Sequence, residues 1–141
     1  MKKQRHKLSH PLHLLVGFDL ITTGVVLLFS RHYFFWPPQP EWVTALENDS
    51  IVGFIGLCTG AGMLLWALSR NRPSSVDHWL ITLATAYYTI ISMTELAHVA
   101  FGNVGFQPYM AMDAMSDVVM IGVALYMAKQ SDSKTEEDED R

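Results

Sequence analysis

The sequence has few charged residues and a single cysteine, Cys58, which stands in an apolar run and cannot form a disulfide within the chain. The redox compartment therefore cannot be inferred from cysteine use. Charged residues make up 17% of the chain, below the roughly one quarter that is usual in soluble domains. They gather in the first seven residues, between Arg70 and Asp77, and after Lys129. The long runs between them have almost no charged residues, which indicates a membrane protein, and 141 residues give room for one domain.

Several functional classes lack their usual signatures. No basic patch with interleaved aromatic residues suggests a nucleic-acid partner. The chain also has no glycine-rich phosphate loop, no His-Glu-x-x-His and no Cys-x-x-Cys. Ser92 or Ser116 beside His98 is no signature of a hydrolase, although a membrane-integral hydrolase stays open. The sequence therefore favours a function other than catalysis.

Four apolar stretches are long enough to cross a bilayer, whose hydrocarbon core of about 30 Å needs roughly 20 residues of helix. Because lipid cannot satisfy backbone polar groups, each stretch is expected to be helical. The predicted fold is an all-α, integral membrane four-helix bundle whose partner is the lipid bilayer. The predicted spans are residues 12–30, 51–68, 79–101 and 109–128.

The distribution of lysine and arginine predicts the orientation. The arm MKKQRHK, the loop with Arg70 and Arg72, and the segment after the fourth span carry nearly all of them, whereas the opposite side has Arg31. The positive-inside rule then places both ends in the cytoplasm of a cell-membrane protein. We expect a cytoplasmic arm at 1–10, the four-span domain at 11–129, and a disordered acidic cytoplasmic tail at 130–141.

The first span could instead be a cleaved signal peptide. Asp19 within the apolar region and the lack of an A-x-A-like site argue against cleavage. After this span comes a long aromatic connection, in which Pro40 could begin a short helix lying on the membrane or acting as a lid. Several aromatic rings near span ends are expected at the lipid interface: Trp66, Trp79, Tyr109 and Tyr126.

The second span is rich in glycine. Gly56-x-x-x-Gly60 is a pattern of small residues that allows two helix backbones to approach closely. We predict that the span packs through Gly56 and Gly60. The partner is another helix of the same chain or, alternatively, a second copy or another membrane protein.

Acidic residues in three of the spans lie on polar helix faces and should face one another. Glu95 and His98 are one turn apart in the third span, and Asp113 and Asp117 are one turn apart in the fourth. Counted at 1.5 Å per residue, these four side chains can meet in the outer half of the membrane. We therefore predict that they share one cavity, with Asp19 of the first span one or two turns away.

The predicted cluster admits several functions. An ionised aspartate at a span centre costs about 2.5–3.5 kcal/mol, and close carboxylates favour one another's neutral form. Glu95, His98, Asp113, Asp117 and Asp19 are therefore candidates for a proton- or cation-responsive site used in transport or sensing. Alternatively, the acids only hold helices together, in an accessory protein or a holin-like pore former. Glu-x-x-His also occurs in metal-binding bundles, so Glu95, His98, Asp113 and Asp117 are candidate ligands of a divalent cation.

Overall fold

The computed structural model describes residues 10–30, 50–69, 73–101 and 108–139, with the side chains of the last stretch described as far as residue 131. These residues form four helices: α1 (Pro11–Phe29), α3 (Ser50–Leu68), α4 (Ser74–Phe101) and α5 (Pro108–Glu139). Each is long and apolar enough to cross a membrane. The predicted all-α bundle of four transmembrane helices is confirmed.

The helix boundaries follow the sequence closely at most ends. Pro11 occupies the first turn of α1, where its missing N–H costs nothing. α4 begins at Ser74, before the predicted residue 79. The largest difference is in α5, which continues past residue 128 to Glu139, so the tail expected to be disordered is helical over most of its length. Extending an existing helix is far easier than starting one, and lysine and glutamate are good helix formers.

The predicted short helix at Pro40 and most of the N-terminal arm lie outside the described residues.

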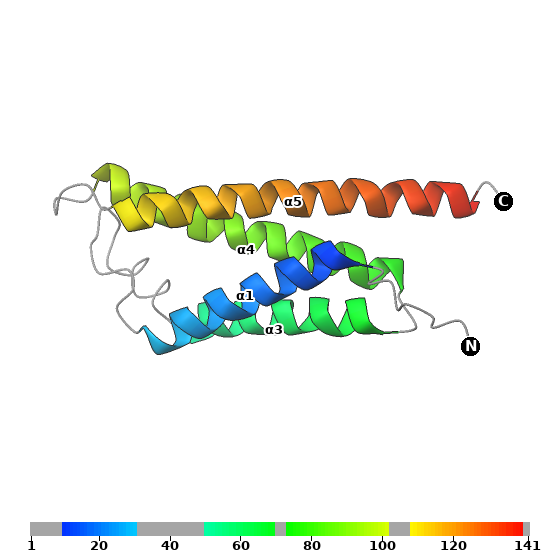
Figure 1. The fold of residues 1–141 in the computed structure, drawn as a ribbon, viewed down its shortest axis with the longest axis horizontal. Coiled ribbons are helices and arrows are strands. Elements are labelled where there is room, and N and C mark those ends of the chain that lie inside the picture. The colour runs from blue at the N-terminus through cyan, green and yellow to red at the C-terminus, as the bar shows by residue number, and fades with distance from the viewer. Residues whose placement is uncertain (1–9, 31–49, 70–72, 102–107, 140–141) are drawn as a thin grey trace, which may run out of the picture.

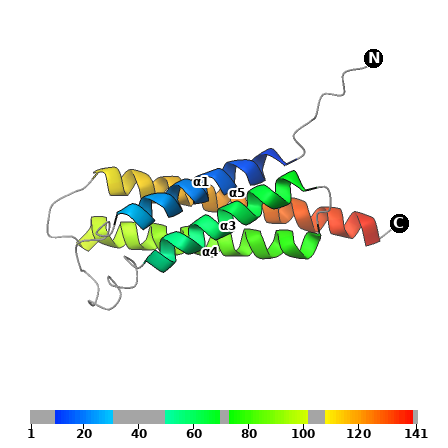
Figure 2. The same ribbon diagram turned by 90° about the horizontal axis from the view of Figure 1, so that it is seen from below.

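The helices form two antiparallel pairs, α1 with α3 and α4 with α5 (Figure 1). α1 and α4 begin, and α3 and α5 end, at the same end of the bundle, which we call the terminal end (Figures 1 and 2). The opposite end, where α1 ends and α5 begins, is called the loop end. The chain therefore crosses the bundle four times, with its described ends on one side.

Glycines bring α1 and α3 into direct backbone contact. A Cβ added at Gly60 would lie 2.5 Å from the carbonyl oxygen of Gly17, and one added at Gly24 would lie 2.6 Å from that of Gly53. Real Cβ atoms do not come so close to backbone atoms, so only glycine fits at these positions. Two glycine pairs seven residues apart in each helix thus fix the register of α1 against α3.

Gly56 has a different main neighbour from Gly60. An added Cβ at Gly56 would lie 2.6 Å from the hydroxyl oxygen of Tyr87, which projects from α4. Gly60 faces α1, whereas Gly56 leaves room for this tyrosine. The glycines of α3 therefore serve contacts with two different helices of the same chain.

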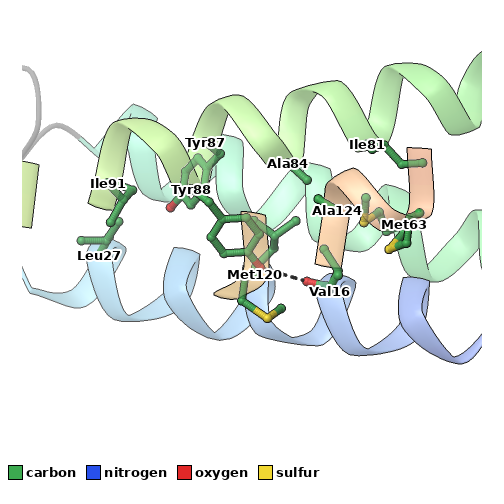
Figure 3. Close-up of a cluster of buried hydrophobic side chains, with 12 residues drawn as sticks. Val16, Leu27, Met63, Ile81, Ala84, Tyr87, Tyr88, Ile91, Met120 and Ala124 are labelled. Carbon is green, nitrogen blue, oxygen red and sulfur yellow. Dashed lines mark hydrogen bonds between the residues drawn. The ribbon is translucent and has the colours of Figure 1, made fainter. Parts of the chain in front are cut away.

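The centre of the bundle is a dry layer of apolar side chains (Figure 3). Val16, Leu20, Met63 and Ala84 are completely buried there. Large apolar side chains also cover the outside, as expected for a surface that faces lipid. Among the rings expected at the interface, Trp79, Tyr109 and Tyr126 are exposed. Trp66, in contrast, is buried inside the bundle.

Replacing Gly24 with alanine should destabilise the bundle, because the new Cβ would overlap the Gly53 carbonyl oxygen and force α1 and α3 apart. Overpacking of this kind costs about 1–3 kcal/mol. Gly122→Ala is the matched control, since nothing lies within 4 Å of a Cβ added there. Thermal unfolding in detergent should show a lower melting temperature for Gly24→Ala and no loss for Gly122→Ala. Equal melting temperatures for the two variants would contradict the close glycine contact.

Candidate functional site

A polar cavity of about 220 Å³ lies in the half of the bundle nearer the loop end. Side chains of α1, α4 and α5 form its walls, and four of them are carboxylates. The lining residues are Asp19, Thr22, Thr23, Val26, Leu27, Ile91, Glu95, Asp113, Ser116 and Asp117. Four of the five predicted proton- or cation-site residues thus meet around one space.

Helical periodicity explains why these residues face the same space. On α1, Thr22 and Thr23 lie three and four residues after Asp19, and Val26 lies three residues after Thr23, which places the four side chains on one face. On α5, Asp113, Ser116 and Asp117 repeat this spacing. The polar faces recognised in the sequence are therefore the faces that the tertiary structure turns inward.

Asp19 is held in place by a tyrosine from another helix. The Tyr88 hydroxyl of α4 donates a hydrogen bond to Oδ2 of Asp19 at 2.7 Å. It also lies 3.4 Å from the Val16 carbonyl oxygen, the contact drawn in Figure 3. The depths estimated at 1.5 Å per residue place Asp19 one or two turns from the other acids, but Asp19 lines the same cavity. That estimate treats every helix as upright, whereas α1 runs obliquely across the bundle (Figure 1).

Asp117 and Glu95 are the most deeply buried acids of the cavity, with 9% and 3% of their surfaces exposed. No hydrogen bond joins the Asp117 carboxylate to another side chain or backbone group of the described residues. An ionised carboxylate buried without a partner is strongly unfavourable. Asp117 therefore points into the cavity as an acceptor whose partner must come from the cavity itself.

The helices supply no strong base to balance these acids. Neither lysine nor arginine occurs in α1, α3, α4 or the membrane-spanning part of α5 as far as residue 128. An ionised aspartate at a span centre costs about 2.5–3.5 kcal/mol, and Asp117 is buried without a hydrogen bond from the described residues. In a bilayer, Asp117 must therefore be protonated or be accompanied in the cavity by water or a cation.

His98 does not line this cavity. Its side chain is buried near the end of α4, with Nδ1 2.8 Å from the Thr94 carbonyl oxygen. His98 lies about one turn further along α4 than Glu95, and of the two side chains only the Glu95 carboxylate reaches the cavity. Within the described residues, no three histidine, cysteine, aspartate or glutamate side chains form a group that could hold a metal ion. The four predicted metal ligands do not form such a site.

A second polar cluster lies at the terminal end and was not recognised in the sequence. Nε2 of His13 lies 2.7 Å from Oδ1 of Asp77, and both side chains are buried. The Ser131 hydroxyl donates to Oδ2 of the same carboxylate at 2.8 Å. This cluster joins α1, α4 and α5. The available signal was a histidine and an aspartate near the starts of the first and third spans, which begin at the same end of the bundle, but Asp77 lies just before the predicted third span at 79–101.

Trp66 completes the cluster from α3. Its ring stacks on His13 with 4.6 Å between centroids, and its indole N–H donates to the Pro73 carbonyl oxygen at 3.2 Å. All four helices therefore meet at the terminal end through polar or aromatic contacts. The tryptophan expected at the lipid surface instead stacks on the buried His13–Asp77 pair.

The cavity and the terminal-end cluster are separated by the apolar layer. Val16, Met63, Ile81, Ala84 and Ala124 lie between them along the bundle, and all are buried. In this conformation the described residues offer no continuous polar path from one end to the other. The apolar layer therefore separates the cavity from the terminal end.

Comparisons of the chain with protein-family models, with curated proteins and with solved structures gave no match.

The His13–Asp77 contact should stabilise the bundle through coupling between the two side chains. A double-mutant cycle with His13→Gln, Asp77→Asn and the double variant, followed by unfolding in detergent, measures this coupling. We expect about 0.5–3 kcal/mol, as for residues in one buried network. The double variant should therefore lose less than the sum of the single losses, because each single change leaves one buried group unpaired. Strictly additive losses would contradict a direct interaction.

Proposed function

We propose that this multi-pass membrane protein binds a cation in the loop-end cavity in competition with protons, and that this exchange serves transport or sensing. The observation that carries the proposal is the cavity itself, with four carboxylates around a space of about 220 Å³ and Asp117 buried there without a hydrogen bond from the described residues. Intramembrane acids that face a cavity are typical of ion and proton pathways.

The charge of the lining selects the sign of the ligand. Asp19, Glu95, Asp113 and Asp117 offer only carboxylate oxygens, and the hydroxyls of Thr22, Thr23 and Ser116 add neutral acceptors and donors. An anion would meet like charge on three helices. A cation, in contrast, lowers the cost of ionising the acids because it supplies the missing positive charge.

Protons and the cation compete for the same oxygens. When no cation is present, burial and mutual repulsion favour protonated carboxyl groups. A monovalent cation that binds to an ionised carboxylate therefore displaces about one proton from the cavity. The affinity for the cation should rise as the pH rises, because fewer protons compete at high pH.

A purely structural role is the main alternative, and one contact favours it. The Tyr88–Asp19 hydrogen bond ties α4 to α1 as a packing interaction would. This role does not account for Asp117, which is buried at the cavity and forms no such bond with any described residue. A holin-like pore has less support, because the apolar layer of Val16, Met63 and Ala84 closes the bundle in this conformation.

The proposed setting is the cell membrane with both termini in the cytoplasm. This proposal is supported by the unequal distribution of lysine and arginine between the two ends of the bundle. The terminal end carries Lys129 and adjoins the basic segments at 1–7 and 70–72, whereas Arg31 follows the end of α1 at the loop end. The positive-inside rule relates this asymmetry to orientation, and the cavity would then lie in the outer half of the membrane.

Asp117→Asn should weaken cation binding and the proton release that accompanies it. A contact to a charged group is worth about 1.5–3 kcal/mol, and 1.4 kcal/mol is tenfold in affinity, so the affinity should fall about tenfold or more. Proton release can be followed with a pH-sensitive dye in weakly buffered nanodiscs while sodium, potassium and organic ammonium salts are added. Uptake into proteoliposomes under a pH gradient then separates transport from binding alone.

Asp77→Asn is the matched control, because it makes the same acid-to-amide change at the terminal end and leaves the cavity intact. Its folded state is checked by its melting temperature before the measurement. Unchanged proton release and binding in both Asp117→Asn and Glu95→Gln would show that the acids are structural. Growth arrest with dye leakage from liposomes would instead favour the pore former.

Orientation is tested by cysteine labelling in a Cys58→Ala background, since Cys58 is exposed on the bundle. Cysteines at positions 4 and 135 should be protected from an impermeant thiol reagent in intact cells and should react after lysis. Position 4 lies in the basic arm, and position 135 follows Lys129 and Lys134 on the same side of the predicted spans, so the positive-inside rule places both in the cytoplasm. Labelling of either position in intact cells would reverse the proposed orientation.

A further inference from the structure

The cavity opens at the side of the bundle, between α1 and α5. The residues contributed by α4, Ile91 and Glu95, are each only 3% exposed and form its floor. On α1, Thr22 is exposed and Val26 is 44% exposed. On α5, Asp113 and Ser116 are exposed. The exposed lining residues thus belong to the two helices at the rim, and the buried ones lie behind them.

This opening lies along the side of the bundle, some distance from the loop end. Ser116 is eight residues from the start of α5 at Pro108, and Thr22 is seven residues from the end of α1 at Phe29. At 1.5 Å per residue, each lies roughly 10–12 Å along its helix from the loop end. In a chain that spans the bilayer, the side of the bundle at this depth faces lipid.

The lining combines acidic and apolar surface. Val26, Leu27 and Ile91 share the cavity with the four carboxylates. An inorganic ion makes no favourable contact with such side chains, whereas alkyl groups bound to a cationic centre do. Ligand pockets typically combine a mostly apolar lining with a few polar groups that fix orientation. The composition fits a cation that carries apolar substituents.

The volume limits which part of a ligand can enter. A cavity of about 220 Å³ is smaller than the roughly 300–1,000 Å³ of pockets that enclose a whole drug-sized ligand. It is large enough for a substituted ammonium group. An attached alkyl chain would extend through the opening between Thr22 and Ser116 and remain in lipid, where it keeps its apolar environment.

We propose that the cavity takes the head group of an amphiphilic organic cation, an alkyl amine or quaternary ammonium, that enters from the bilayer between α1 and α5. Asp117, buried behind the rim and free of hydrogen bonds within the described residues, receives the positive charge. Val26, Leu27 and Ile91 contact the alkyl groups. This inference rests on the proposed cation exchange and adds the class of ligand and its route of entry.

The test compares three cations by proton release from the protein in nanodiscs, with empty nanodiscs subtracted. Dodecyltrimethylammonium has both head and tail, tetramethylammonium has the head alone, and sodium has neither. We expect the tailed cation to act at a concentration at least tenfold lower than the other two. Asp117→Asn should remove most of this response.

Entry is tested at two adjacent valines of α1. Val26 lines the cavity, whereas Val25 is exposed but is not among the lining residues. Val26→Trp should block the opening and weaken the response to dodecyltrimethylammonium about tenfold or more, and Val25→Trp should leave it unchanged. The matched pair separates obstruction of the opening from a general effect of a large ring on the helix surface.

Each other outcome has a definite meaning. If all three cations act equally and Val26→Trp changes nothing, the ligand is not amphiphilic and entry is not lateral, although the cation exchange stands. If no cation releases protons, the proposed function fails and this inference fails with it. If cysteines at positions 22 and 116 in the Cys58→Ala background cross-link between two copies in nanodiscs, a second copy covers the opening, and lateral entry of a lipid-phase cation is overturned.

Discussion

Asp117 lies buried in a bundle whose spans contain neither lysine nor arginine, so no strong base within the helices balances its charge. In water this would matter little, because solvent stabilises an isolated carboxylate. In a bilayer each ionised acid costs several kilocalories per mole unless a proton, water or a cation accompanies it. The cavity, the Tyr88–Asp19 hydrogen bond and the burial of Asp117 can all be understood from this requirement.

The two polar regions of the bundle satisfy the requirement in different ways. At the terminal end, Asp77 has two partners within the protein, His13 and Ser131, and Trp66 covers the pair. Such a region is complete in itself and holds the four helices together. In the loop-end cavity, Asp117 lines open space and receives no hydrogen bond from the part of the chain that the structure describes. The contrast explains why the first region is assigned to stability and the second to binding.

The cavity owes its position to the arrangement of the helices in two pairs. Glycine contacts hold α1 against α3 at backbone distance, and α4 packs along α5. The cavity lies where the two pairs meet, with one rim on α1 and the other on α5.

Hydropathy and helical periodicity alone determined the four spans and the polar faces of Asp19, Asp113 and Asp117, because both depend on residues near one another in the chain. The sequence also identified α3 as a glycine-rich helix. It did not determine which helix each glycine meets, how far α5 extends, or that Trp66 is buried. Those depend on how helices are rotated and tilted against one another, which side chains on all of them decide together.

The packing of the helices also explains why His98 lies outside the cavity and why the His13–Asp77 contact was not predicted. His98 and Glu95 are one turn apart in the sequence, yet only Glu95 reaches the cavity, because one turn along α4 carries His98 past its end. His13 and Asp77 are 64 residues apart and meet at 2.7 Å. Local spacing fixes the face on which a residue lies, whereas contact between faces is fixed only when the helices pack.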